Sequence, residues 1–105
     1  MKIQFNTGRN IIGSEELRTS LTSIISEELS RFNDHITRLE VHLSDEDSNK
    51  NGVNDKRCMI EARLEGMKPI AVTNHADTQE QAVTGAVQKL KSSLNTIQGR
   101  SRNHK

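Results

Sequence analysis

Three polar side chains, His42, Glu61 and His75, are of the types that bind metal ions or exchange protons. Each falls at an outward position of a segment in which apolar and polar residues alternate, as in a strand with one solvated face. Their spacing matches no compact metal-binding motif, and a solvated sheet face is sufficient to explain polar residues at all three positions. We therefore expect no metal site and no cofactor.

Cys58, the only cysteine, is the other residue that could act as a nucleophile. It lies at an inward position with apolar neighbours, two residues before Ile60, so we expect a small buried core thiol. Catalysis would also need a base and an orienting group within reach. We expect no enzyme activity. A lone cysteine cannot form an internal disulfide, which suits a reducing cytosol.

Periodicity predicts the elements that hold these residues. Alternation of apolar and polar residues predicts strands, and apolar residues at spacings of three to five predict one-sided helices. The expected order is a strand over 2–5, a helix over 14–33, strands over 36–47, 57–65 and 69–75, and a helix that begins at Asp77 or Thr78 and ends at Gly99. This β-α-β-β-β-α order predicts an α+β fold, a two-layer sandwich with a four-stranded sheet and both helices on one face.

Composition limits the class of protein. At 105 residues we expect a single domain over 1–98, followed by a basic disordered tail over 99–105. No apolar run approaches the roughly 20 residues that span a membrane, and the N-terminus has no apolar signal segment, so we expect a cytoplasmic protein. With two Phe, no Tyr and no Trp, base stacking on aromatic platforms is not expected.

Charge is unevenly distributed although the net charge is only +1. No acidic residue follows Glu80, and the C-terminal end is basic. This is typical of a phosphate-binding patch, and also of a solubilising terminus. Cations flank the expected loops at Lys56 and Lys68 and lie on the second helix at Lys89 and Lys91, where they could grip a phosphate backbone without reading bases.

The outward row of the third strand alternates in sign and is a poor surface for phosphates. It consists of Arg57, Glu61, Arg63 and Glu65. We expect these side chains to form ion pairs with neighbouring strands, each contributing about 0–1 kcal/mol.

Several segments in this order resemble one known family. They are "TGRNI" after the first strand, "VHLSDE" on the second, "CMIEARLEG" on the third, and "AVTNHADTQEQAVTGAVQKLKSSL" leading into the second helix. The chain resembles the short form of the ribosome hibernation promoting factors, also described as the ribosome-associated inhibitor or sigma-54 modulation family. The likeness spans nearly the whole chain, and it implies a fold related to double-stranded RNA-binding domains.

The resemblance also implies a function and a set of contacts. Family members dock on the small ribosomal subunit near the decoding centre and block the messenger and transfer RNA sites without a chemical step. Cations on both helices contact the ribosomal RNA in the family. The matching candidates here are Lys89, Lys91 and Arg100 on or just beyond the second helix, and Arg18 and Arg31 on the first, beside Lys56 and Lys68.

Two functions follow as expectations. The first is a ribosome-binding translation inhibitor, active in ribosome hibernation under stress, with the small subunit and its rRNA as partners. The alternative is a protein-interaction module of the same fold that no longer binds ribosomes, because the first helix is rich in Glu. We expect a monomer, with pairing through an exposed sheet edge as the other arrangement, and no ribosome pairing, since the chain ends before the dimerisation domain of the long family form.

Overall fold

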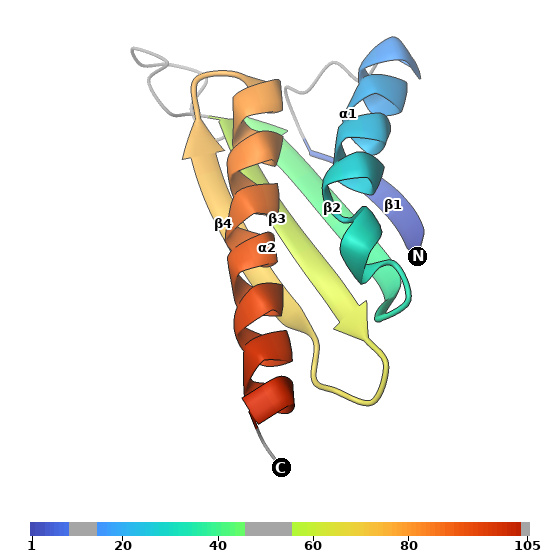
Figure 1. Ribbon diagram of the computed structural model, residues 1–105. Coiled ribbons are helices and arrows are strands. Elements are labelled where there is room, and N and C mark those ends of the chain that lie inside the picture. The colour runs from blue at the N-terminus through green and yellow to red at the C-terminus, as the bar shows by residue number, and fades with distance from the viewer. Residues whose placement is uncertain (9–14, 46–55, 104–105) are drawn as a thin grey trace.

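The computed structural model describes residues 1–8, 15–45 and 56–103, with only the backbone over 98–103 (Figure 1). The elements are β1 (Lys2–Thr7), α1 (Glu15–Glu28), a 3₁₀ turn η1 (Ser30–Phe32), β2 (Ile36–Asp45), β3 (Lys56–Leu64), β4 (Ile70–Ala76) and α2 (Gln79–Asn103). Most of the "TGRNI" segment and residues 104 and 105 lie outside the described residues. The β-α-β-β-β-α order predicted from periodicity is confirmed.

The four strands form one sheet in the order β1-β2-β3-β4. Strands β1 and β2 are parallel because α1 carries the chain back between them, whereas β2, β3 and β4 are joined by reversals and run antiparallel. In the register, Phe5 lies opposite Val41, Val41 opposite Ile60, and Ile60 opposite Val72. This row of apolar side chains crosses the sheet on the face that the helices cover.

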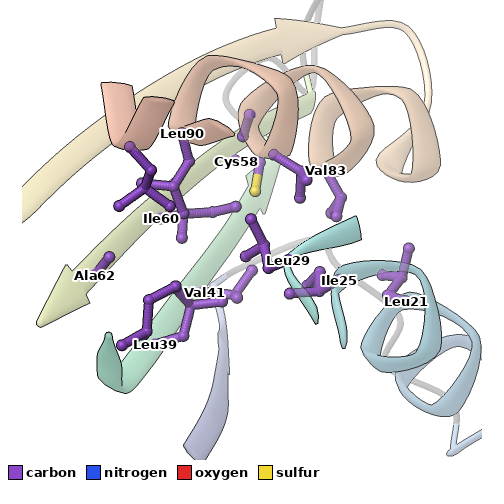
Figure 2. Packing of buried hydrophobic residues seen from close by; sticks show 14 of the residues in the cluster. Leu21, Ile25, Leu29, Leu39, Val41, Cys58, Ile60, Ala62, Val83 and Leu90 are labelled. Carbon is purple, nitrogen blue, oxygen red and sulfur yellow. The ribbon is translucent and has the colours of Figure 1, made fainter. Parts of the chain in front are cut away.

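Both helices pack on that one face of the sheet, α1 over the β1 and β2 side and α2 over the β3 and β4 side (Figure 1). Figure 2 shows the layer between them, where Leu21 and Ile25 of α1 and Val83 and Leu90 of α2 meet the inward side chains of the sheet. All four side chains are at most 1% exposed. The other face of the sheet has no covering element among the described residues, and so the predicted α+β two-layer sandwich is confirmed.

Helix ends differ in detail from the sequence expectation. The first helix ends at Glu28, and η1 then carries the chain to Phe32, whose side chain is 1% exposed. A tightened last turn of this kind is common at helix ends. At the start of α2, the backbone N–H of Gln81 donates to Oγ1 of Thr78 over 3.1 Å, so Thr78 rather than Asp77 caps this helix.

The prediction that the second helix ends at Gly99 is wrong. Helix α2 continues through Gly99 to Asn103, so the backbone over 99–103 is helical where a disordered tail is expected from the sequence. A glycine inside a helix costs only about 1 kcal/mol relative to alanine, and it needs a following proline or a left-handed backbone to end the helix. The sequence has no proline after Pro69.

Candidate nucleic-acid interface

The seam between α1 and α2 contains the first of the predicted cations, Lys91. Its Nζ lies 3.0 Å from Oε1 of Glu28, and Nε2 of Gln88 donates to the same oxygen over 3.0 Å. The hydrogen bonds from Lys91 and then Gln88, together with the charge of Lys91, hold the pKa of Glu28 below its usual value of 4.5. Glu28 is therefore ionised at neutral pH and balances much of the charge of Lys91.

Arg31 lies on the same seam, in the 3₁₀ turn. Its guanidinium stands 4.8 Å from the ring centroid of Phe32, a cation–π contact, and its Nη2 donates to Oδ1 of Asn95 on α2. Because Asn95 follows Lys91 by four residues, both contacts lie on one side of α2. The partners of Arg31 are uncharged, so its positive charge is not neutralised by either contact.

Lys89 points to a different side of α2. Residues two apart on a helix are turned by roughly 200° from each other, so Lys89 and Lys91 cannot share a face. The Nζ of Lys89 donates to the backbone oxygen of Thr73 in β4 over 2.7 Å. Since β4 is the last strand of the sheet, this contact covers part of an edge that could otherwise pair with a second chain.

Lys68 lies in the connection between β3 and β4, and it is exposed. The adjacent Met67 lines a hollow of about 140 Å³ together with Phe32, Leu94, Ile97 and the acidic Glu65. The β3–β4 connection, the 3₁₀ turn and the C-terminal part of α2 therefore meet around this hollow. Arg31 and Lys68 adjoin two of its lining residues in the chain and Lys91 lies one turn of α2 before Leu94, and we call the part of the molecule that carries these three cations the basic end.

The remaining candidates do not join this surface. Lys56 begins β3 and forms an ion pair with Asp45, Nζ to Oδ2 over 3.1 Å, whereas Lys68 follows the other end of that strand. A nine-residue strand separates its two ends by roughly 27 Å. Arg18 is exposed on α1, ten residues and so about 15 Å along the helix from Glu28. The side chain of Arg100 lies outside the described residues, although its backbone extends α2 from the basic end.

On the open face of the sheet, Arg63 forms one of the ion pairs expected for the outward row of β3, whereas Glu65 lies beyond the end of this strand and lines the hollow. Nε of Arg63 lies 3.8 Å and Nε of Arg38 lies 3.6 Å from Oε2 of Glu40, and Nε2 of His42 lies 3.4 Å from Oε1 of Glu61. Of the three polar residues considered from the sequence, His75 lies opposite Arg57 on β4, and it is Glu40, directly opposite Glu61, that lies near His42 and Glu61.

Cys58 lies in the core, as predicted from its apolar neighbours. Its side chain is 0% exposed, and its sulfur lies between the sheet and the helices in Figure 2. Burial raises the pKa of the thiol to about 12, against a smaller lowering effect of the nearby Arg57 charge. At neutral pH the thiol is protonated and shielded, so it lacks the thiolate character that a nucleophile needs.

The family profile described as sigma 54 modulation protein / S30EA ribosomal protein matches residues 6–102, nearly the whole chain. The chain belongs to this family. Its members associate with the ribosome, and the resemblance found in the sequence is thereby confirmed. Among curated proteins no sequence matches the chain significantly. No helix among the described residues is long and apolar enough to cross a membrane.

Two solved structures have the same fold as this sigma 54 modulation / S30EA family member. A ribosomal subunit interface protein from Coxiella burnetii is 20% identical in sequence and superposes with a TM-score of 0.70. The match covers 94% of this chain and 99% of the Coxiella protein. The N-terminal domain of Protein Y from Thermus thermophilus is 22% identical with a TM-score of 0.72, covering 92% of this chain and 99% of its own. At these identities the likeness demonstrates a shared architecture.

Sequence reasoning missed two features of the interface. It did not identify Glu28 as the partner of Lys91, which lies 63 residues away in the chain. It also did not identify Asn95 as the residue that anchors Arg31 to α2. The available signal was weak in both cases, because a polar residue on an exposed helix position gives no indication of which neighbouring helix it will face.

Proposed function

We propose that this protein inhibits translation by binding the small ribosomal subunit near the decoding centre and sterically occupying the messenger and transfer RNA sites. The role involves binding without a chemical step, and it places the protein in the cytoplasm with the ribosome. The observation that supports it most is membership of a ribosome-associated family whose profile matches residues 6–102.

The basic end is the proposed RNA contact. Arg31, Lys68 and Lys91 come from three different elements that meet there, and the backbone of α2 projects Arg100 from the same end. Such cations bind phosphates and position a protein without reading base sequence.

We assign the secondary contacts to Lys89, Arg18 and Lys56, which lie outside this surface. Binding by a monomer is proposed, because Lys89 covers part of the β4 edge through the carbonyl of Thr73.

The charge of α1 supports the alternative, a protein-interaction module that does not bind ribosomes. Glu15, Glu16 and Glu27 are exposed on this helix, and Glu28 is paired with Lys91. An acidic surface that approaches RNA is repelled by the phosphates. In the preferred function, the basic end therefore makes the main contact with the RNA, and α1 contributes only the secondary contact of Arg18. Capture of one specific protein, with no ribosomal RNA, from an extract at low salt would favour the alternative.

A competition experiment on vacant small subunits tests the steric mechanism. Labelled protein is bound to subunits, and messenger RNA with transfer RNA is titrated in. If the sites overlap, the apparent Kd of the protein rises in proportion to the concentration of the RNA ligands. An unchanged Kd at saturating RNA concentrations would contradict the steric mechanism.

One matched pair of variants tests the location. Lys68→Gln and Lys56→Gln make the same chemical change at the two ends of β3. The account predicts weaker binding for Lys68→Gln, with a salt slope shallower by about one, and a smaller effect for Lys56→Gln. Equal effects of the two variants would exclude the basic end as the main contact. Thermal unfolding of both variants controls for changes in stability.

A further inference from the structure

The open face of the sheet brings together three residues of metal-binding type, Glu40, His42 and Glu61. Glu40 on β2 lies directly opposite Glu61 on β3, and His42 follows two residues along β2 on the same side of the sheet. One ligand atom from each residue can be chosen so that all three lie within 4.8 Å of one another. All three residues are of intermediate burial, so the site is open to solvent on one side.

The distance between His42 and Glu61 is the one expected for two ligands of the same metal ion. Nε2 of His42 lies 3.4 Å from Oε1 of Glu61. Two ligands at about 2.1 Å from a tetrahedral zinc ion are separated by roughly 3.4 Å. The two atoms do not form a hydrogen bond. Among the described residues, Nε2 of His42 is the one buried side-chain nitrogen or oxygen without a hydrogen-bond partner. Its lone pair or proton is therefore left unsatisfied, although the side chains of His42 and Glu61 are 32% and 42% exposed.

The carboxylate of Glu40 is already held in place for such a role. The guanidinium groups of Arg38 and Arg63 both approach Oε2, at 3.6 Å and 3.8 Å. Their charges offset the repulsion between Glu40 and Glu61, which would otherwise destabilise two acids placed directly opposite each other. Since both arginines approach the same oxygen, Oε1 of Glu40 can turn toward His42 and Glu61.

We propose that Glu40, His42 and Glu61 bind one divalent transition-metal ion of the Zn²⁺ class on the open face of the sheet. One imidazole nitrogen and two carboxylate oxygens are ligands that Zn²⁺ accepts, with water in a fourth position, whereas Ca²⁺ and Mg²⁺ prefer oxygen alone. The ion would link β2 to β3. The site lies on the face opposite the helices, so this proposal and the proposed function can fail independently.

The test uses the full chain and Zn²⁺ alone. Isothermal titration is expected to give about one bound ion per chain, and the midpoint of thermal unfolding rises with Zn²⁺ because the ion binds the folded state. In NMR spectra the ring resonances of His42 shift on titration while those of His75 do not. The expected loss of affinity in His42→Ala and in the near-isosteric Glu61→Gln is about tenfold or more.

His75→Ala is the matched control, because it removes the other outward histidine of the sheet and is expected to leave Zn²⁺ affinity unchanged. Circular dichroism without metal checks that each variant is folded. Three results would each overturn the proposal: no saturable binding to the natural chain, undiminished binding by His42→Ala and Glu61→Gln, or loss of binding in His75→Ala. The wild-type NMR titration keeps the test decisive even where a variant does not fold.

Discussion

At the scale of single residues, Glu28 offsets part of the positive charge on α2. Its carboxylate lies 3.0 Å from Nζ of Lys91 and accepts a second hydrogen bond from Gln88. Because the pKa of Glu28 in the folded chain is below 4.5, the contribution of this pair to stability is present above pH 4.5 and is lost as pH falls through the folded pKa. At neutral pH the pair is intact, and the seam is less positive than a count of cations indicates.

Neutralising the two partners should therefore have opposite effects on binding. Glu28→Gln removes the compensating charge and is expected to tighten binding to small subunits about twofold to tenfold, since the charge of Lys91 is then no longer offset. Lys91→Gln is expected to weaken it. Both Kd values can be measured at one low salt concentration. A loss of affinity in Glu28→Gln would show that the seam does not face the RNA.

The sequence predicted correctly which side of the sheet the side chains of β3 face, but it did not predict which residues lie opposite them. The alternation in β3 correctly predicted that Cys58 faces the core and that Glu61 and Arg63 face outward. It could not predict that Glu40 stands opposite Glu61, because strand register is set by long-range packing that a single sequence does not reveal. The site on the open sheet face depends on that register.

At the scale of elements, α2 is fixed to β4 by one close contact. Nδ2 of Asn74 reaches the carbonyl oxygens of Gln81 and Ala82 over 3.4 Å and 3.3 Å, at the beginning of α2. A Cβ placed on Gly85 would lie 2.1 Å from the same nitrogen. The absence of a side chain at Gly85 thus lets β4 and α2 approach closely while the amide of Asn74 stays bonded to the helix.

This contact predicts that Gly85→Ala destabilises the protein although alanine favours helices. Alanine gains about 1 kcal/mol of helix propensity, but it displaces the partly buried Asn74 amide from its acceptors, which costs about 1–3 kcal/mol. We expect a net loss of about 1 kcal/mol in urea unfolding. In an Asn74→Ala background the same Gly85→Ala change should be neutral or stabilising. Destabilisation of similar size in both backgrounds would contradict the proposed contact.

Element boundaries were less predictable than the elements themselves. The four strands and two helices follow from the period of their apolar residues, which the core directly requires. The end of α2 at Asn103 could not be predicted from Gly99, because the local cost of one glycine is small beside the hydrogen bonds of a continuing helix. The additional turn extends the last part of α2 beyond the sheet (Figure 1).

At the scale of the whole molecule, the charges divide between its surfaces. The exposed acids of α1, the paired charges of the open sheet face and the basic end occupy different regions of the fold. A net charge of +1 hides this division. The two-layer architecture and the family were predictable from the sequence. That the elements carrying Arg31, Lys68 and Lys91 border one hollow was not, because these elements lie far apart in the chain. The proposed RNA contact depends on that arrangement.

Co-sedimentation with purified small ribosomal subunits over a salt series tests whether the protein binds the subunit through phosphate contacts. Binding through phosphate contacts releases counterions, so affinity should fall steeply and linearly on logarithmic axes as salt rises. The account predicts that the protein sediments with small subunits at low salt and is released progressively as the salt concentration increases. Absence of the protein from the subunit fraction at the lowest salt, or binding that does not respond to salt, would contradict it.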